Sequence, residues 1–475
     1  MVGEKTRRKK SRMLREEPGE EPKVDGKIIN FTVTQADDLD AALHFYNPWW
    51  TGEMPKYLTK EYKRDVYQKL EKYLGLNRIV ILKGPRRVGK TTLMYQLIEK
   101  LAKEIDSRQI LYVSFDDPKL KDFDAILEKY QTTILQNSLE SKQTYFFLDE
   151  VQYLKDWQYH LKKYYDRNYP IKFIASGSSA TMIRQGTESL MGRTVEETIL
   201  PFSFKEYMQY KLKRVVAIKP DADSIEIKKY EKDAKILFEE YVLKGGFPNI
   251  FDVREPELWE KLIKEDIIDK VIYKDIATQY DIKRPENLEK LFLYLTSING
   301  QILNVSNIAG SLQMSVEYTS KYIQYLKNSY LILEAGKYAA SIEKTIRSSQ
   351  KVYVIDPGIV NSLLSKTKTD EAGHTIESVI AVHLQRQGLE YYYWREYYEV
   401  DFVIETKEGP LPIEVKYGNH PTKEDLKGLI KFMDKYDCKK GLVVTKDLRQ
   451  TIDAGGRKVE CVPAWLYLLW ENVKR

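Results

Sequence analysis

The feature of the sequence that most constrains the fold is one glycine-rich loop with a predicted strand before it and a predicted helix after it. The loop reads Gly84-Pro85-Arg86-Arg87-Val88-Gly89-Lys90-Thr91 and fits the pattern G-x-x-x-x-G-K-[ST]. The apolar run 79–82 predicts the strand, and residues 92–101 predict the helix. This order aims several backbone N–H groups and the positive end of a helix dipole at one point. The sequence therefore predicts a polyphosphate site rather than an ordinary glycine-rich turn.

The residues of this loop have separate predicted roles. Lys90 would reach the β- and γ-phosphates of ATP, and the hydroxyl of Thr91 would hold Mg²⁺. The predicted nucleotide contacts are Gly84, Pro85, Arg86, Arg87, Val88, Gly89, Lys90, Thr91 and Thr92.

The segments that follow predict a parallel α/β sheet. Runs 110–115, 145–148 and 171–175 are apolar throughout and alternate with helical segments. Strands of that kind are typical of a parallel sheet covered on both faces. Ligands of such sheets bind at the carboxyl ends of the strands.

Two acidic residues follow the strand at 145–148. Asp149 is placed to bind the Mg²⁺ shell, and Glu150 to orient or polarise the attacking water. Two adjacent carboxylates repel each other unless a cation is near. An acidic pair at a helix N-terminus is the alternative, but it leaves the preceding strand unexplained.

Two further residues are candidates for phosphate contacts. Ser178, after the strand at 171–175, could bond a γ-phosphate or its water, or could instead cap a helix. Arg193 could present its guanidinium to phosphate charge, in the same chain or across a subunit interface. A surface ion pair is the alternative for Arg193.

Composition limits the class of protein. At 475 residues the chain is long enough for several domains, and its net charge of +6 permits an anionic partner without requiring one. The nearly uncharged apolar run 461–470 is far shorter than the ~18 residues of a membrane span. There are two cysteines and five scattered histidines, so we expect no disulfide framework and no histidine metal site. These observations predict a cytoplasmic protein that does not span a membrane.

The first half of the chain divides into four predicted parts. Residues 1–27 should be a disordered charged tail, because they have almost no apolar content. Residues 28–60 form an extension whose aromatic cluster at 45–50 should pack on the next domain or serve as a platform for the nucleotide base. Residues 61–205, opening with a helix at 61–74, form the nucleotide-binding core, and 206–284 predict a helical lid.

Residues 285–355 predict a winged helix-turn-helix. The pattern gives helices at 286–298, 304–312 and 316–328, followed by strands at 330–334 and 351–355. The third helix would expose Thr319, Ser320, Lys321, Gln324 and Lys327 to phosphates and base edges. Its charge is slight, so binding to DNA and binding to protein both stay open.

Residues 356–475 contain a second candidate site. Asp401 lies in a predicted strand at 399–404, and Glu414 and Lys416 share one face of the next strand, at 412–416. Asp401 and Glu414 would bind Mg²⁺ or Mn²⁺, and Lys416 would orient water or steady the charge of a phosphodiester transition state. Glu377, on a predicted helix at 375–387, could complete the site. A salt-bridged sheet edge is the alternative.

Taken together, these motifs resemble a known family along the chain from the Asn47-Pro48-Trp49-Trp50 stretch nearly to its end. The chain is similar to archaeal and bacterial AAA-type (AAA+) ATPases fused to a C-terminal domain of unknown function. The segments that carry the resemblance are 84–91, 147–152, 176–179, 190–193, 200–207, 245–248, 393–395, 399–403 and 412–416.

The resemblance implies an α/β protein with a P-loop AAA-type ATPase core and helical lid, a winged helix, and a C-terminal α/β domain like the PD-(D/E)XK (restriction-endonuclease-like) nucleases. On that match Glu377, Asp401, Glu414 and Lys416 fall on the nuclease motif positions. After the Glu-x-Lys strand the chain has Lys423, Lys427 and Lys431 but no glutamine signature. The expected partners are ATP, DNA and a protein partner, and an oligomer would let Arg193 act between subunits. We therefore expect an ATPase that couples its nucleotide state to the winged-helix and nuclease-like module, which would act on DNA, with a metal-dependent DNA endonuclease as a possible second activity. The alternative function is a signalling or interaction ATPase whose winged helix binds protein and whose nuclease fold is an inactive scaffold.

Overall fold

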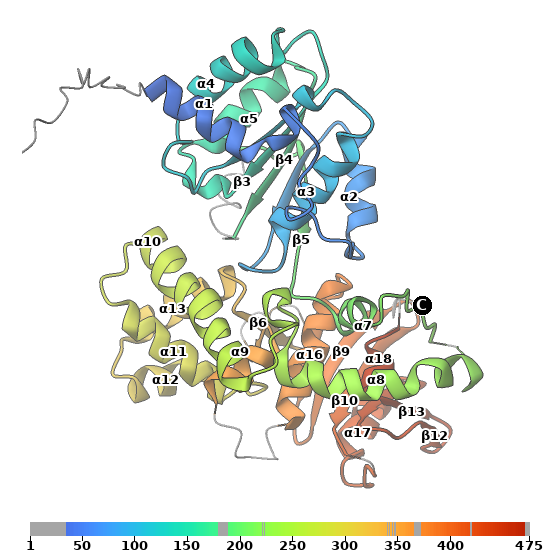
Figure 1. The fold of residues 1–475 in the computed structure, drawn as a ribbon. Coiled ribbons are helices and arrows are strands. Elements are labelled where there is room, and N and C mark those ends of the chain that lie inside the picture. The colour runs from blue at the N-terminus through green and yellow to red at the C-terminus, as the bar shows by residue number, and fades with distance from the viewer. Residues whose placement is uncertain are drawn as a thin grey trace, which may run out of the picture.

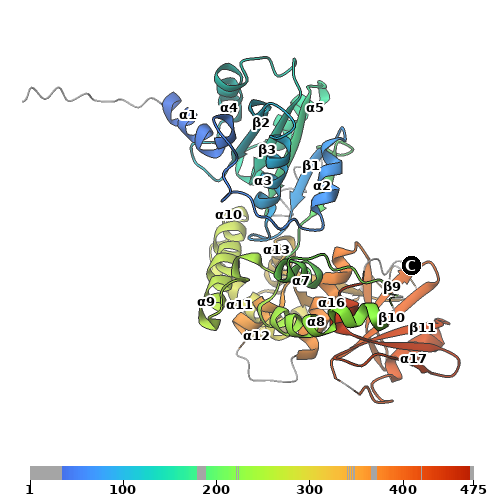
Figure 2. The same ribbon diagram turned by 45° about the vertical axis from the view of Figure 1, so that its right-hand side comes forward.

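The chain folds into two lobes (Figures 1 and 2). The structure is a computed structural model and describes residues 35–178, 189–220, 222, 224–339, 341, 343, 345, 348–364, 372–418 and 420–470. The predicted tail at 1–27 lies outside these residues. The upper lobe runs to about residue 200, and the chain then passes down into the lower lobe, which holds the rest. Among the described residues, no helix has the length and apolar character needed to cross a membrane.

The first lobe is built on a five-stranded sheet in the order β2-β3-β4-β1-β5, and every neighbouring pair is parallel. This confirms the predicted parallel sheet. Its strands are β1 (Ile79–Lys83), β2 (Ile110–Ser114), β3 (Thr144–Asp149), β4 (Ile171–Gly177) and β5 (Thr194–Thr198). Its helices are α1 (Gln35–Tyr46), α2 (Tyr67–Leu74), α3 (Lys90–Leu101), α4 (Phe123–Lys129) and α5 (Trp157–Asp166).

Alternating residues of β1 bury on the two faces of this sheet. Val80 and Leu82 pack in one apolar cluster, and Ile79 and Ile81 pack in another. A central parallel strand must be apolar on both faces for this reason. The helix predicted at 61–74 begins only at Tyr67, because the residues before it form turns.

The aromatic extension covers the edge strand β2. The side chain of Asn47 accepts from Tyr112 N at 2.6 Å and donates to Tyr112 O at 2.9 Å, as a neighbouring strand would. The indole N–H groups of Trp49 and Trp50 both donate to Ile110 O, at 3.2 and 2.8 Å. The extension therefore packs on the core along β2, and the Tyr46 hydroxyl donates to Asp117 Oδ2 at 3.2 Å, beyond the carboxyl end of this strand. A platform for the nucleotide base stays a prediction.

The second lobe contains an eight-stranded sheet in the order β12-β13-β11-β10-β9-β8-β6-β7. Its strands are β6 (Ile332–Lys337), β7 (Lys351–Val354), β8 (Tyr391–Arg395), β9 (Glu399–Thr406), β10 (Gly409–Lys416), β11 (Lys440–Thr445), β12 (Gln450–Asp453) and β13 (Lys458–Pro463). Its helical segments are α7 (Phe204–Leu212), α8 (Ser224–Lys244), α9 (Pro256–Ile263), η6 (Lys264–Ile276), α10 (Ala277–Gln279), α11 (Pro285–Ser297), α12 (Val305–Ser311), α13 (Val316–Asn328), α15 (Pro357–Leu363), α16 (Ala372–Arg386), α17 (Lys427–Lys435) and α18 (Ala464–Tyr467).

The hairpin that follows the three helices α11, α12 and α13 joins the C-terminal sheet. Strands β6 and β7 pair antiparallel, and β6 continues into a parallel pairing with β8 through Gly336 and Lys337. Segments 285–355 and 356–475 therefore share one sheet. On α13 the side chain of Thr319 is buried and donates to Ser315 O, contrary to its predicted exposure, whereas Ser320, Lys321, Gln324 and Lys327 are exposed.

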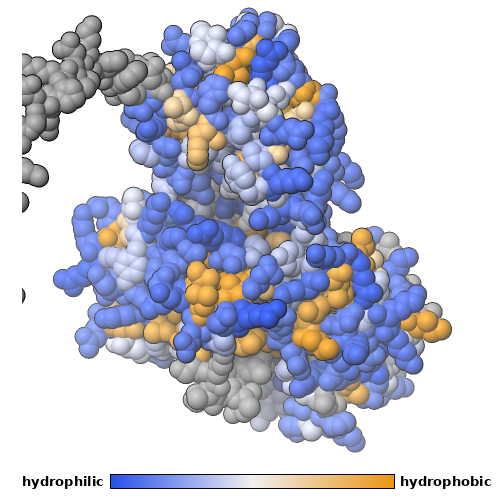
Figure 3. All heavy atoms as spheres, viewed as in Figure 1, coloured by the Kyte–Doolittle hydropathy of each residue, from blue (hydrophilic) through white to orange (hydrophobic). Residues whose placement is uncertain are grey.

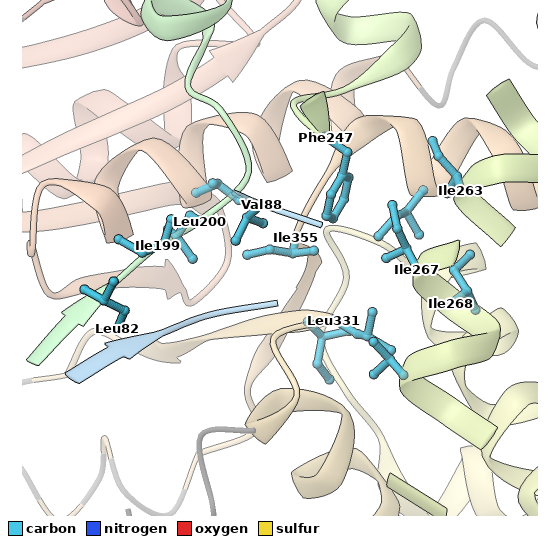
Figure 4. Packing of buried hydrophobic residues seen from close by; sticks show 14 of the residues in the cluster. Leu82, Val88, Ile199, Leu200, Phe247, Ile263, Ile267, Ile268, Leu331 and Ile355 are labelled. Carbon is cyan, nitrogen blue, oxygen red and sulfur yellow. The ribbon is translucent and has the colours of Figure 1, made fainter. Parts of the chain in front are cut away.

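The segment predicted as a lid divides into two parts with different contacts. Helices α7 and α8 pack in one core with the C-terminal sheet, through residues such as Phe204 and Phe238. Segment η6, a π-helical continuation of α9, lies instead against the phosphate loop. A second core joins the lobes at that place, where Val88 and Leu200 meet Ile267 and Ile355 (Figure 4). Both parts of the predicted lid therefore lie in the second lobe, but η6 faces the phosphate loop whereas α7 and α8 pack on the C-terminal sheet.

Candidate functional sites

The glycine-rich loop connects β1 to α3 as the sequence predicts. Gly84 has φ +144°, and a Cβ at this position would lie 2.0 Å from Ile199 O, so only glycine fits. Gly89 has φ +95° and caps α3. The ammonium of Lys90 donates to Gly84 O at 2.9 Å and to Pro85 O at 2.8 Å inside the loop. Burial lowers the pKa of Lys90.

Of the other predicted loop contacts, Val88 and Thr92 have different surroundings. The side chain of Val88 is fully buried between the lobes, so only its backbone is available to a ligand. Thr92 lies in the first turn of α3 and is partly exposed.

Asp149 at the end of β3 is the centre of the site. Its Oδ2 accepts from Thr91 Oγ1 at 2.6 Å and from the hydroxyl of Tyr112 at 2.9 Å. Its Oδ1 accepts from Ser176 Oγ and from Glu150 N. The predicted Mg²⁺ ligands Thr91 and Asp149 thus lie together, one hydroxyl and one carboxylate beside the loop, and this donor set fits Mg²⁺. Sequence reasoning missed Tyr112, which lies inside an apolar strand and carries no separate signal.

Glu150 occupies a turn directly after Asp149. Its backbone is left-handed, with φ +54°, and its carboxylate accepts from the amide of Gln152. Burial raises the pKa of Glu150, with Lys90 acting in the opposite direction. The same amide of Gln152 lies 3.1 Å from Ser178 Oγ. The predicted site residues Glu150 and Ser178 are therefore bridged by Gln152, which sequence reasoning assigned no role.

Two arginines of the loop are held by acids of the other lobe. Arg86 makes two hydrogen bonds to Asp275 on η6, both of 2.6 Å, and Arg87 pairs with Asp266 at 3.1 Å. The Ser178 hydroxyl lies 3.4 Å from the same Asp275 carboxylate. Asp275 is a helical residue 126 positions after Asp149, so no local pattern in the sequence places it there.

The structure corrects the interpretation of Arg193 as a phosphate contact within the chain. Arg193 precedes β5, and its carbonyl accepts from Ile79 N at the start of β1. The loop follows the other end of β1, so Arg193 lies at the opposite edge of the sheet. Its guanidinium pairs with Asp166 instead, at 2.5 Å.

The C-terminal candidate residues also lie together. Glu377 of α16, Asp401 of β9, and Glu414 and Lys416 of β10 line one pocket of ≈ 360 Å³. Lys416 pairs with Glu414 at 2.8 Å. Burial raises the pKa of Glu377 and, strongly, that of Glu414, and the neighbouring Asp401 carboxylate adds to both shifts.

The same pocket contains a lysine that sequence reasoning missed. Lys351, at the start of β7, is 2% exposed, and its ammonium lies 2.9 Å from Glu377, 3.1 Å from Asp401 and 2.8 Å from Glu399. The prediction of a Mg²⁺ or Mn²⁺ site from Glu377, Asp401 and Glu414 does not fit this geometry, because an ammonium already bonds the first two carboxylates. In the part of the chain that the structure describes, no three His, Cys, Asp or Glu residues are arranged to hold a metal ion.

Comparison with protein families gives three matches. Residues 76–208 match an AAA domain, residues 235–370 match a domain of unknown function (DUF8612), and residues 372–467 match another domain of unknown function (DUF4143). The AAA match covers the loop, Asp149 and Glu150. The first lobe is an AAA-type P-loop domain, which supports ATP binding and hydrolysis.

The chain also has relatives across most of its length. An uncharacterized protein of Methanocaldococcus jannaschii, MJ1544, is 28% identical over 413 residues, which are 83% of this chain and 88% of that protein. An uncharacterized protein of Haemophilus influenzae is 26% identical over 416 residues, 85% of this chain and 98% of that protein.

Among solved structures, AMPPCP-bound DnaA from Aquifex aeolicus has a TM-score of 0.27 at 16% identity and covers 60% of this chain and 92% of its own. PCH-2 of C. elegans has a TM-score of 0.24 at 15% identity, and the match covers 43% of this chain and 56% of the PCH-2 chain. These structural likenesses are too weak to carry an argument about this chain.

Proposed function

We propose that the chain is a Mg²⁺-dependent ATPase whose nucleotide state is communicated to the second lobe. The observation that carries the proposal is the set of contacts around Asp149, which brings Thr91 and Glu150 to the carboxyl ends of β1 and β3 beside Lys90. Thr91 and Asp149 would hold Mg²⁺, which neutralises charge that develops on the phosphate oxygens. Lys90 binds the β- and γ-phosphates, and Glu150 orients the attacking water.

The contacts of the loop arginines support the communication step. Phosphate groups at the loop would attract Arg86 and Arg87 and repel Asp275 and Asp266, which now hold them. Both acids lie on η6. Competition between the nucleotide phosphates and these acids for Arg86 and Arg87 would therefore couple the loop to the second lobe.

The test of the ATPase is turnover of Mg·ATP by four proteins. Lys90→Ala should abolish turnover, and Glu150→Gln should bind ATP but hydrolyse it at least ~10²-fold more slowly. Lys83→Ala is the matched control, because Lys83 lies at the end of the same strand and pairs with Glu196 instead. Unchanged turnover in Lys90→Ala would contradict the proposed site.

We further propose that the second lobe is the module that ATP controls, with a winged helix and a nuclease-like fold acting on DNA. Helices α11 to α13 with the β6–β7 hairpin have the element order of a winged helix. The exposed Ser320, Lys321, Gln324 and Lys327 of α13 are suited to phosphates and base edges. Glu377, Asp401, Glu414 and Lys416 supply the nuclease-like pocket.

One observation favours the alternative, an interaction ATPase whose nuclease fold is a scaffold. The ammonium of Lys351 occupies the space between Glu377 and Asp401 that a catalytic metal would need. A protein with this arrangement would bind partners through the second lobe without cutting DNA.

A cleavage assay separates the nuclease module from the scaffold. The protein is incubated with labelled linear, forked and four-way DNA and with Mg²⁺ or Mn²⁺, in the presence and absence of ATP. Cleavage by the wild type that is lost in Asp401→Ala supports the nuclease module. ATP turnover without cleavage under any condition supports the scaffold.

A further inference from the structure

Lys351 reaches the acidic pocket from the hairpin rather than from the elements that supply the carboxylates. It opens β7, whereas Glu377 lies on α16 and both Glu399 and Asp401 lie on β9. A buried ammonium is costly unless it is paired, and three carboxylates pair this one. The two carboxylates of Glu377 and Asp401 would repel each other if no cation lay between them.

The hydrogen bonds of the pocket leave few oxygens for any other cation. Asp401 accepts from Lys351 at Oδ1 and from Val415 N at Oδ2. Glu377 accepts from Lys351 at Oε2, and its Oε1 is hydrogen-bonded to His374 Nδ1. Glu414 is different, because Oε1 pairs with Lys416 while Oε2 is buried and has no hydrogen-bond partner. Among Glu377, Asp401 and Glu414, a single oxygen is therefore free, and one free carboxylate oxygen beside an ammonium is a poor site for a divalent ion.

The charge of the pocket nevertheless favours a cation. Six carboxylates line it, against two lysines and one histidine. They are Glu377, Glu399, Asp401, Glu414, Glu424 and Asp425. Removing the ammonium would free one oxygen each of Glu377 and Asp401 beside the unpaired Oε2 of Glu414, and those three oxygens are a donor set for a hard divalent ion.

We propose that Lys351 is a resident cation that excludes divalent metal from this pocket, so that the hairpin residue sets the metal affinity of the C-terminal half. The proposal rests on the proposed C-terminal pocket and is independent of the ATPase. It makes the pocket metal-free as long as β7 holds its present position, and metal-binding when Lys351 is withdrawn.

The experiment is Mn²⁺ binding to the nucleotide-free protein, measured by electron paramagnetic resonance and by calorimetry. Lys351→Met keeps the length and apolar stem of the side chain and removes the charge. We expect it to bind one additional Mn²⁺ at least tenfold more tightly than the wild type. The double variant Lys351→Met/Glu414→Gln should lose that ion, which separates it from Mn²⁺ bound near Asp149.

Lys337→Met is the matched control, because Lys337 lies on the same hairpin but does not line the pocket. Circular dichroism and urea unfolding of each variant report that the chain is folded, and Lys351→Gln serves as a second variant if Lys351→Met unfolds. Equal Mn²⁺ affinity in wild type and both Lys351 variants would overturn the proposal. Tighter Mn²⁺ binding by Lys351→Met than by the wild type, without DNA cleavage by the wild type, would support the proposal and would favour the scaffold over the nuclease.

Discussion

At the scale of single residues, one carboxylate holds the nucleotide site together. Asp149 collects hydrogen bonds from Thr91, Tyr112 and Ser176, so its position is fixed before any ligand binds. A fixed carboxylate loses little freedom when it binds a metal shell, and preorganisation of this kind lowers the cost of the reaction.

The role of the Thr91 hydroxyl can be separated from its size. Thr91→Ala removes the donor to Asp149 and the proposed Mg²⁺ ligand, so we expect kcat/KM for Mg·ATP to fall by about 10²-fold or more. Thr91→Ser keeps the hydroxyl and should retain most of the activity. Steady-state turnover across a Mg²⁺ titration measures both, and equal activity of the Ala and Ser variants would contradict the assignment.

His383 predicts a pH dependence of stability. Burial, together with the charge of Arg386, lowers its pKa from 6.5 to about 3. Between pH 3 and pH 6.5 the unfolded chain binds a proton at His383 that the folded chain does not bind. The stability that neutral His383 contributes is therefore complete above pH 6.5 and is lost as the pH falls towards 3. As the pH falls from 6.5 towards 3, the free energy of unfolding of the wild type should decrease more steeply than that of His383→Gln. The difference in slope should be up to about 1.4 kcal/mol per pH unit. Urea unfolding from pH 7 to 4 measures this difference.

The residues that the sequence predicts are those with a local pattern. Lys90, Thr91, Asp149 and Glu150 each follow a strand within a few positions, and the geometry brings them together. Asp275 and Lys351 were missed because each reaches its site from a remote element, and neither helix nor hairpin patterns indicate what a charged side chain will meet.

At the scale of elements, η6 is the part of the second lobe that contacts the phosphate loop. Its acids bind Arg86 and Arg87, and its apolar side chains share a core with Val88. The predicted lid at 206–284 contained this segment but also α7 and α8, which pack on the C-terminal sheet. Helical periodicity gave the correct type of element but not the partner of each apolar face, because periodicity shows which face is buried and not what packs against it.

The contact between η6 and the loop predicts an effect on ATP affinity. Asp275→Asn removes a negative charge near the phosphate site and weakens the hold on Arg86, so we expect ATP to bind about tenfold more tightly, or ~1.4 kcal/mol. Glu265→Gln is the control, because Glu265 lies on the same segment in an exposed pair with Lys261. Titration with a fluorescent nucleotide gives the ATP affinity of each variant. Weaker binding in Asp275→Asn than in the wild type would contradict the proposed competition between Asp275 and the phosphates for Arg86.

At the scale of the whole molecule, a buried charge network joins the lobes. Arg64 donates to Val88 O in the phosphate loop at 3.0 Å and makes two hydrogen bonds to Glu206 on α7. Glu206 also accepts from Arg386 of α16 at 3.3 Å, and Glu377 lies on the same helix, in its first half. Although burial alone would raise the pKa of Glu206, the two arginines hold it at about 2. One set of contacts therefore runs from the loop to the helix that lines the acidic pocket. The face of the molecule in Figure 3 is mostly hydrophilic, with apolar residues gathered at a few places on the lower lobe.

Loss of the central carboxylate should destabilise the protein. Glu206→Ala leaves the buried Arg64 and the half-buried Arg386 without their carboxylate partner, so we expect the free energy of unfolding to fall by about 3–5 kcal/mol. Glu239→Ala, an exposed change on α8, should have little effect. Chemical denaturation measures the free energy of unfolding of both variants. Equal values for Glu206→Ala and Glu239→Ala would show that the network does not hold the lobes together.

The most direct test of the central claim is hydrogen exchange of residues 264–276 in Glu150→Gln, with and without Mg·ATP. The account predicts faster exchange along η6 when ATP is bound, because the phosphates compete for Arg86 and Arg87, and no change in Lys90→Ala. Unchanged exchange in Glu150→Gln that is saturated with ATP would show that the nucleotide does not act on the second lobe through η6.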